Sequence, residues 1–271
     1  MGHYDRNCSS VSVPVVKLSG AHVLVTGATR GIGLALAEAF AGAGASITAV
    51  ARPGPRLDEL ACRGWRTAAA DLSRVQDVDG LVDRAASAGG PVDVLVNNAG
   101  LNVAVVLREL DADTLRRVLT TNLLAPFELA RQALPSMVDR CRGAVVNISS
   151  IAGELALRNQ VPYCASKSGL THGTRALQRE LRGTGVAAHP VVLGLVATDM
   201  IHDLSADPVG GQMAKRFDRL PALDAAVVAN RVVRVVERGR GAVVMPALAA
   251  PAHYLRLTPT YLTDGLLAGI R

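Results

Sequence analysis

Short apolar runs alternate along the chain with longer segments in which apolar and polar residues follow a helical period. The apolar runs are expected as strands, and they cover residues 21–26, 46–51, 65–70, 92–96, 144–149, 186–192 and 242–245. The segments between them are expected as helices over residues 32–41, 73–87, 111–140, 162–181 and 224–238. Strict alternation with short connections is typical of βαβ units. We therefore predict an α/β fold with a doubly wound, mostly parallel, seven-stranded sheet and helices on both faces.

The composition indicates what fills the core of this fold. Hydrophobic residues make up 49% of the chain but aromatic residues only 3%, so Ala, Val and Leu must supply the packing. Such residues suit buried parallel strands covered by alanine-rich helices. The 271 residues contain no repeat, linker or low-complexity tract. We predict a single domain with flexible residues 1–17, a substrate loop at about 200–222 and a helical C-terminal tail at about 247–271.

Charge and cysteine usage exclude several classes of protein. The net charge of +6 is spread over single arginines without interleaved aromatic residues. A nucleic-acid surface is therefore not expected, whereas an attraction for nucleotide phosphates is. The four cysteines are far apart in the sequence, so we expect them to be free thiols: Cys8, Cys62, Cys141 and Cys164. The histidines are also far apart, so we expect no metal site. Neither a signal peptide nor an apolar run of membrane-spanning length is found, which predicts a cytoplasmic protein without a transmembrane segment.

A glycine-rich turn follows the first expected strand. It reads Thr26-Gly27-Ala28-Thr29-Arg30-Gly31-Ile32-Gly33 and leads into the first expected helix. The glycines permit a tight turn, close approach of the backbone to a pyrophosphate, and close packing of the helix. The start of the helix would offer free N–H groups and a partial positive charge to the phosphates. Its position between a strand and a helix therefore predicts a dinucleotide-binding turn.

A tyrosine and a lysine four residues apart, Tyr163 and Lys167, lie in a segment that is expected to be helical. That spacing places both on one face, so the ammonium can lower the pKa of the phenol. A shift of ~2–3 units from the ordinary value near ~10 takes roughly 3–4 kcal/mol of charge stabilisation. Such a tyrosine could exchange a proton with a substrate oxygen near neutral pH. Because the spacing also occurs by chance, its meaning depends on the other motifs.

Four motifs in register resemble those of a known family. The glycine turn is followed by Asn97-Asn98-Ala99-Gly100 after the fourth expected strand, by Ser150 after the fifth, and then by the Tyr163 and Lys167 pair. In this order and spacing the chain, from about residue 18 to 200, resembles a short-chain dehydrogenase/reductase of the compact, single-domain branch. The resemblance implies a Rossmann-type fold and a nicotinamide cofactor.

The resemblance also implies a role for each catalytic residue. Tyr163 would be the general acid in carbonyl reduction, or the base in alcohol oxidation, and Lys167 would lower its pKa and hold the nicotinamide ribose. Ser150 would hydrogen-bond the substrate oxygen, with Ser149 as the alternative. Asn122 would anchor a water molecule for proton relay to the lysine.

The end of the second expected strand favours NADP(H) as the cofactor. A carboxylate at this point would accept bonds from the ribose hydroxyls of NAD, but Ala51 and then Arg52 stand there. Arg30 in the glycine turn supplies a second guanidinium, and arginine pairs well with a 2′-phosphate. Asp71 would contact the adenine. The full set of expected cofactor-binding residues is Gly27, Thr29, Arg30, Gly31, Ile32, Gly33, Arg52, Asp71, Leu72, Asn97, Asn98, Ala99, Gly100, Tyr163, Lys167, Gly194, Val196 and Thr198.

Two departures from the family pattern concern the C-terminal third. Leu193 stands where the family usually has proline, although Gly194 and Thr198 are kept. The family's usual C-terminal Asp-Gly-Gly strand, which packs into a tetramer, is also missing. A homodimer or homotetramer is expected, and the tail could cover the substrate cleft, pack across a dimer or rest on a membrane surface.

The leading hypothesis is an NADPH-dependent reductase of a hydrophobic ketone or aldehyde, or the reverse alcohol dehydrogenase. An alternative from another class is a sensor or scaffold that binds NADP(H) without turnover, but the presence of all four catalytic residues disfavours it. A sugar-nucleotide epimerase or dehydratase would need a larger C-terminal substrate domain.

Overall fold

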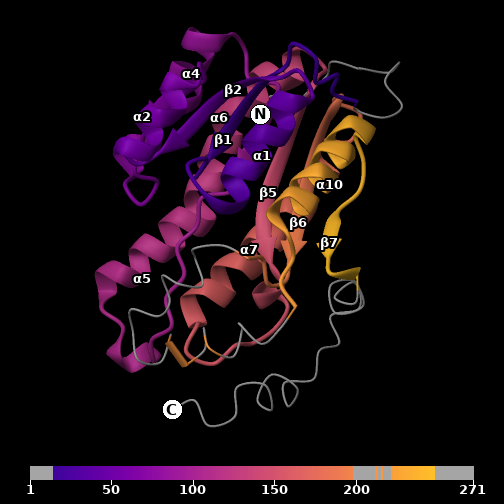
Figure 1. Cartoon of the computed structure of the whole chain (residues 1–271). Coiled ribbons are helices and arrows are strands. Elements are labelled where there is room, and N and C mark those ends of the chain that lie inside the picture. The colour runs from indigo at the N-terminus through magenta and orange to yellow at the C-terminus, as the bar shows by residue number, and fades with distance from the viewer. Residues whose placement is uncertain (1–14, 198–210, 213–214, 216–220, 248–271) are drawn as a thin grey trace.

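The computed structural model describes residues 15–197, 211–212, 215 and 221–247. Its strands form one seven-stranded sheet in the order β3-β2-β1-β4-β5-β6-β7 (Figure 1). All the paired strands run parallel. The strands are β1 (His22–Thr26), β2 (Ser46–Ala51), β3 (Arg66–Ala69), β4 (Val94–Asn97), β5 (Gly143–Ser150), β6 (Val186–Leu193) and β7 (Val243–Met245). The predicted doubly wound parallel sheet is confirmed.

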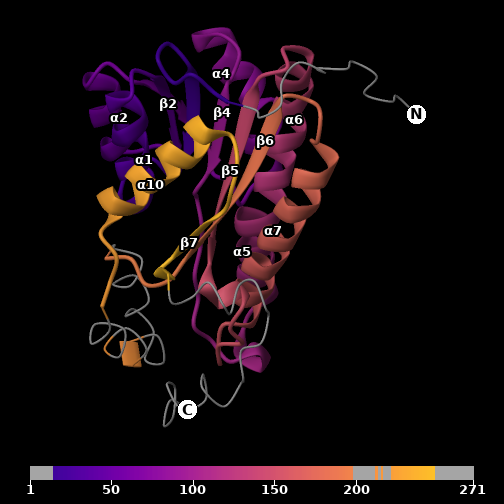
Figure 2. The same cartoon turned by 90° about the vertical axis from the view of Figure 1, so that its right-hand side faces the viewer.

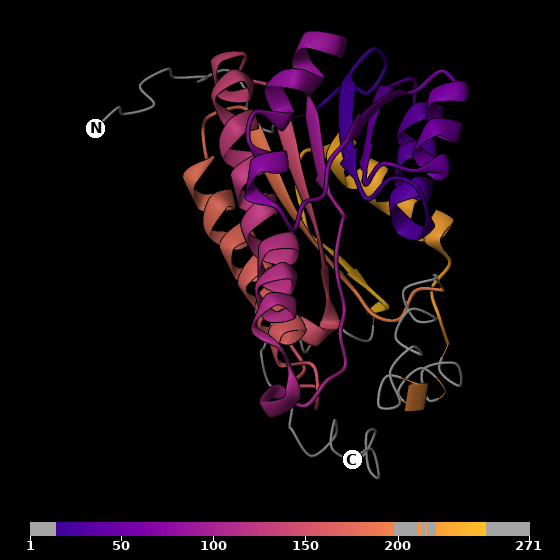
Figure 3. The same ribbon diagram turned by 90° about the vertical axis from the view of Figure 1, so that its left-hand side faces the viewer.

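Helices cover both faces of the sheet. Figure 2 shows α1 and α10 on one side and α6 and α7 on the other, and Figure 3 shows these layers from the opposite direction. The helices are α1 (Gly31–Gly42), α2 (Pro55–Cys62), α3 (Val75–Val78), α4 (Leu81–Gly89), α5 (Ala112–Leu119), α6 (Ala125–Asp139), α7 (Val161–Glu180) and α10 (Ala225–Arg238). Shorter turns lie at Leu107–Glu109, Thr120–Leu124 and Ile151–Gly153.

Alternation along the strands divides the apolar residues between two core layers. In β1, Val23 and Val25 pack with α1, α2 and α10, whereas Leu24 between them packs with α4 and α6. Successive strand residues point to opposite faces, so a fully apolar strand supplies both layers. This explains why apolar runs located the strands to within about two residues.

The helices differ from the expectation at three places. The helix expected over 73–87 is two helices, α3 and α4, because Gly80 between them adopts a left-handed φ of 64°. The long helix expected over 111–140 is interrupted by a π-helical turn at Thr120–Leu124. Helix α2 was not predicted, since only Leu57 and Leu60 of its eight residues are buried.

Pro126 explains the π-helical turn. Proline has no N–H, so Pro126 cannot donate the helical hydrogen bond to the carbonyl of Asn122, four residues earlier. The chain adapts by a longer hydrogen bond, from the N–H of Ala125 to the carbonyl of Thr120. Such π turns are frequent at functional sites. The π-helical turn at Pro126 therefore contains Asn122, a candidate catalytic residue.

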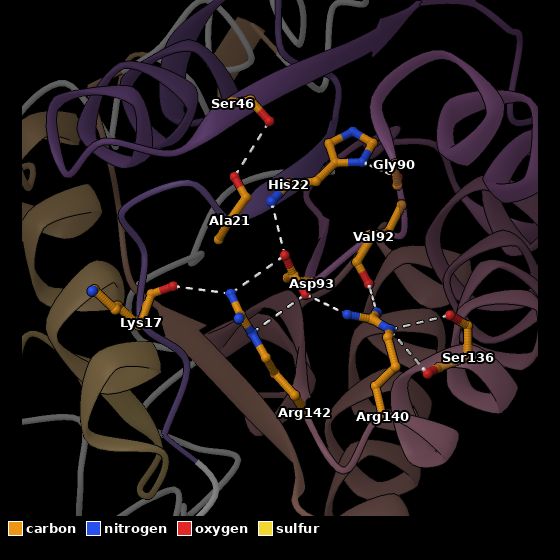
Figure 4. Close-up of polar contacts among 10 residues, drawn as sticks. All are labelled: Lys17, Ala21, His22, Ser46, Gly90, Val92, Asp93, Ser136, Arg140 and Arg142. Carbon is orange, nitrogen blue, oxygen red and sulfur yellow. Dashed lines mark hydrogen bonds and ion pairs between the residues drawn. The ribbon is translucent and has the colours of Figure 1, made fainter.

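The amino ends of β1, β4 and β5 are tied together by Asp93 (Figure 4). Its carboxylate accepts a 2.6 Å bond from Arg140 and a 3.0 Å bond from the backbone N–H of His22, and it pairs with Arg142 at 3.4 Å. The ring of His22 donates from Nδ1 to the carbonyl of Gly90, so Nε2 accepts from the hydroxyl of Thr48. These bonds join β1, β2 and the starts of β4 and β5 at the end of the sheet away from the glycine turn.

Cys141 corrects the expectation of four free thiols. It is disulfide-bonded in the structure, whereas Cys62 and Cys164 are free. Over the described ranges, no three His, Cys, Asp or Glu side chains gather in a way that could hold a metal ion. None of the helices in the same ranges is both long and apolar enough to span a membrane.

Candidate active site

The glycine turn lies at the carboxyl end of β1, where the chain order of the sheet reverses between β1 and β4. Such switch points are where ligands bind in open parallel sheets. Gly27 and Gly31 have left-handed φ values of 65° and 54°. A side chain on Gly33 would collide with the carbonyl oxygen of Gly27. The local backbone geometry therefore requires glycine at each of the three positions.

Helix α1 starts without any of the groups that commonly satisfy a helix N-terminus. Its N-cap residue, Arg30, makes no side-chain capping bond, and its first turn carries no acidic residue. By contrast, Asp111 caps α5 and Asp224 caps α10. The free N–H groups and the helix dipole favour an anion at this end of α1.

Thr26 and Asn98 hold the glycine turn against the end of β4. The Thr26 hydroxyl accepts bonds from the backbone N–H groups of Asn98 and Ala99, at 3.0 and 3.1 Å. The Asn98 amide donates to the carbonyls of Thr26 and Gly27, at 3.0 and 3.3 Å. Hydrogen bonds from the Asn-Asn-Ala-Gly motif therefore hold the glycine turn in place.

A cleft of about 1280 Å³ runs from the glycine turn across the ends of β2 and β3. This volume exceeds the ~300–1,000 Å³ of a typical small-molecule pocket. Twelve of the expected cofactor-binding residues line it: Gly27, Thr29, Arg30, Gly31, Ile32, Gly33, Arg52, Asp71, Leu72, Asn98, Ala99 and Gly100. The cleft is also lined by residues that were not predicted from the sequence: Arg56, Arg74, Arg117 and Thr121.

Asn97 corrects one expectation about the cleft. Its side chain is buried and donates to the carbonyl of Pro126 at 3.1 Å and to the Asn147 side chain at 2.8 Å. It therefore joins β4 to β5 and α6 and does not line the cleft. Tyr163, Lys167, Gly194 and Val196 are also absent from the lining of the cleft. Thr198 lies outside the described residues.

Tyr163, Lys167 and Ser150 meet at the start of α7 and the end of β5. Ser150 lies close enough to the Tyr163 phenol for its hydroxyl to act against the rise in the pKa of that phenol. The Lys167 ammonium lies 5.9 Å from the centre of the Tyr163 ring and donates a 2.9 Å bond to the carbonyl of Ile148. Both ring and ammonium are buried, at 8% and 5% exposure. A carbonyl oxygen that reached this point would find two hydroxyl groups together.

Ser149 is committed elsewhere. Its hydroxyl bonds to the carbonyl of Lys167 at 2.9 Å and to the Thr171 hydroxyl at 2.7 Å. It therefore fixes α7 on the sheet, and Ser150 is the serine that faces Tyr163. A second bond of this kind joins Asn147 to Thr174, one turn further along α7, at 2.8 Å.

Burial controls the ionisation of the pair. Desolvation raises the pKa of Tyr163 above its ordinary value, and the Ser150 hydroxyl offsets only part of this. Desolvation also lowers the pKa of Lys167 to about 8. The net shift of the Tyr163 pKa is thus upward, with burial as its largest cause, and Lys167 is not among the causes. Tyr163 is a neutral phenol at pH 7.

Asn122 lies beside this pair, but its amide is fully used. It accepts a 2.7 Å bond from the N–H of Leu101 and donates to the carbonyl of Leu101 at 2.8 Å and to Ser166 at 3.1 Å. Ser166 in turn donates to the carbonyl of Tyr163 at 2.8 Å. The side chain of Asn122 therefore links the loop after β4 to α7, and its backbone carbonyl is the group that Pro126 leaves without a helical donor.

Residues 21–209 match the short chain dehydrogenase family. The chain is 35% identical over 230 residues to the ketoacyl reductase HetN of Nostoc, covering 81% of this chain and 76% of that protein. It is 30% identical over 204 residues to the 3-oxoacyl-(acyl-carrier-protein) reductase FabG of Escherichia coli, covering 74% and 83%. A crystal structure of a short-chain dehydrogenase/reductase from Burkholderia phymatum in complex with NAD is similar, with a TM-score of 0.78 and 25% identity over 88% of this chain and 93% of that one.

Proposed function

The chain belongs to the short-chain dehydrogenase family, and from this premise we propose that it reduces a ketone or aldehyde on a hydrophobic small molecule with NADPH. Family membership makes it an oxidoreductase with a nicotinamide cofactor. The observation that carries NADPH-dependent carbonyl reduction is that Ser150, Tyr163 and Lys167 lie together beside a cleft of about 1280 Å³. The relatives that are ketoacyl reductases make a 3-oxoacyl thioester the first substrate to test.

Protonation supports the direction of reduction. The neutral Tyr163 phenol can donate its proton to the substrate oxygen, while the Ser150 hydroxyl donates a hydrogen bond to the same oxygen. When bound, the reduced nicotinamide supplies the hydride that the carbonyl carbon accepts. Burial of the site keeps water away from the oxygen as negative charge develops on it.

Reprotonation of Tyr163 would pass through Lys167. Its ammonium can return the proton that the phenol gives up, because its pKa near 8 lies close to neutral pH. The backbone carbonyl of Asn122, to which Pro126 cannot donate, would accept from a water that resupplies the lysine. The Asn122 side chain has a different duty, since its bonds hold Leu101 and Ser166 in place.

The choice of NADPH depends on charge at the end of β2. Arg52 lines the cleft there, no carboxylate precedes it, and Arg30 lines the same cleft from the glycine turn. Two guanidinium groups favour a 2′-phosphate.

A cytoplasmic location and a homo-oligomer remain predictions.

The proposed function is tested by the oxidation of NADPH, and separately of NADH, with a panel of ketones, aldehydes and 3-oxoacyl thioesters. We expect turnover with NADPH and at least one ketone. Binding of NADPH without turnover on the whole panel would favour a sensor or scaffold instead. For the cofactor, Arg52→Ala should weaken NADPH about 10-fold or more and NADH little. Arg63→Ala, which removes an exposed partner of Glu38, is the matched control.

A further inference from the structure

The amino end of the sheet carries a cysteine in an unusual backbone conformation. Cys141 lies in the turn between α6 and β5, and its φ of 48° falls in the left-handed region. Glycine adopts this conformation most readily, and another residue that is kept there commonly has a use for its side chain. The sulfur of Cys141 has such a use, because it is disulfide-bonded.

The partner of Cys141 follows from the other cysteines. The chain contains four cysteines. Because Cys62 and Cys164 are free, Cys8 is the remaining candidate within one chain. Cys8 itself lies outside the described residues. A disulfide needs Cα atoms within about 7 Å of each other, so residue 8 must be able to reach the turn between α6 and β5.

The described start of the chain is bonded to the residue that follows this cysteine. The guanidinium of Arg142 donates a 3.2 Å bond to the carbonyl of Lys17 (Figure 4). Val16 and Leu18, on either side of Lys17, are buried in the core layer that packs on α1 and α10, which fixes this contact. Cys8 stands nine positions before Lys17, and nine residues span at most about 30 Å. Cys8 can therefore reach the turn.

The turn itself is held firmly by the fold. The N–H of Cys141 donates to the carbonyl of Val138 at 2.9 Å, and the N–H of Arg142 donates to that of Met137 at 3.0 Å. A side chain on Gly185 would collide with the carbonyl oxygen of Cys141, so the chain just before β6 packs directly on this backbone. A bond at this sulfur therefore joins the start of the chain to a fixed point.

We propose that Cys8 and Cys141 form a redox-controlled disulfide that fastens the start of the chain to the amino end of the sheet. The other two thiols have different surroundings. Cys62 is exposed at the end of α2, and burial raises the pKa of Cys164, which keeps it a thiol. The disulfide lies at the opposite end of the sheet from Tyr163, so it should control stability and leave turnover unchanged. The inference does not depend on the proposed function.

The oxidant is a small disulfide such as glutathione disulfide. The thiolate of one cysteine attacks a sulfur of glutathione disulfide, forms a mixed disulfide and releases one glutathione. The thiolate of the second cysteine then attacks the protein sulfur of the mixed disulfide and releases the second glutathione. Two electrons pass from the cysteines to the two glutathiones, which also take up the two protons. Excess dithiothreitol reverses the bond formation.

Peptide mapping of the full chain tests the connection. The protein is equilibrated in a mixture of reduced and oxidised glutathione, labelled with N-ethylmaleimide under denaturing conditions and digested before or after reduction. We expect a peptide that joins Cys8 to Cys141 before reduction, and maleimide on both residues only after it. Cys62 and Cys164 should carry the label in both samples. Label on Cys8 and Cys141 before reduction would overturn the proposal, as would a covalent dimer that reductant dissolves.

Thermal unfolding measures what the bond does. It closes a loop of more than a hundred residues, so dithiothreitol should lower the unfolding midpoint of the oxidised protein by roughly 5–10 °C. Cys8→Ser should show the lower midpoint with and without dithiothreitol. The matched control, Cys62→Ser, should respond to dithiothreitol as the wild type does. A wild-type midpoint that ignores dithiothreitol, or a Cys8→Ser midpoint that still falls with it, would overturn the proposal.

Discussion

The two ends of the sheet use polar groups in opposite ways. At the amino end, Asp93 is surrounded by donors from Arg140, Arg142 and His22, and the His22 ring is bonded at both nitrogens. At the carboxyl end, α1 is uncapped, the Thr121 hydroxyl has no partner in the described chain, and burial disfavours the charged forms of Tyr163 and Lys167.

This difference shows where stability and where binding capacity are located. Groups that satisfy one another stabilise the fold but have nothing left for a ligand. Groups left unsatisfied cost stability and are available for binding and proton transfer. Substitutions at the amino end should therefore lower stability and leave activity per folded molecule unchanged. Substitutions at the carboxyl end should lower activity and leave stability unchanged.

The largest effect is expected from Lys167→Ala. Loss of the buried ammonium removes the proton donor that resets Tyr163, so kcat for ketone reduction should fall by roughly 10²- to 10⁴-fold. The unfolding midpoint should not fall, because the removed group is a desolvated cation. Arg179→Ala, at an exposed position in the last turn of the same helix, should leave kcat unchanged. Comparable kinetics in the two variants would contradict the assignment.

Asp93→Asn should produce the largest loss of stability at the amino end. It weakens the bonds to two partly buried arginines, and we expect the free energy of unfolding in urea to fall by about 2 kcal/mol. Turnover per folded molecule should be unchanged. The control is Glu128→Gln, which breaks an exposed pair with Arg131 on α6 and should hardly move the unfolding midpoint. A loss of kcat in Asp93→Asn without a loss of stability would break the comparison.

The pH dependence of reduction should report Lys167. Its pKa is lowered to about 8, so the ammonium is present below that pH and is lost above it. The kcat/KM for reduction should therefore be flat below about pH 8 and fall by up to about 10-fold per pH unit above it. A profile that stays flat to pH 10 would show that the charge on Lys167 is not needed.

A smaller pH effect is expected on stability. Burial lowers the pKa of His22 and of His189 below the ordinary 6.5, so each is neutral in the folded chain while the unfolded chain takes up a proton. The stabilisation is complete above pH 6.5 and is lost as the pH falls toward the folded-state pKa values. The slope for each residue cannot exceed about 1.4 kcal/mol per pH unit. Urea unfolding from pH 8 to pH 5 measures it, and His189→Leu should make the slope shallower.

The sheet and the motifs could be predicted because each depends on local sequence. Buried parallel strands are continuous apolar runs, so the strand bounds were nearly correct. The glycine turn is likewise local, since Gly27, Gly31 and Gly33 are required by backbone geometry. The four-residue spacing of Tyr163 and Lys167 placed both on one helix face.

What could not be predicted depends on tertiary packing. Asn97 and Asn98 are adjacent in one motif, but neighbouring residues at the end of a strand point to opposite sides, so one is buried and the other braces the turn. The raised pKa of Tyr163 follows from burial, which the spacing alone does not contain. Arg117 resembles any exposed helical arginine until α5 is seen to line the cleft.

The central claim is that Tyr163 donates the proton to a substrate oxygen at a site that binds the cofactor independently. It is tested most directly by Tyr163→Phe, with NADPH affinity and single-turnover reduction measured on the same sample. We predict NADPH binding within about two-fold of wild type and a rate of reduction lower by roughly 10²- to 10⁴-fold. Reduction at the wild-type rate by the phenylalanine variant would contradict the account.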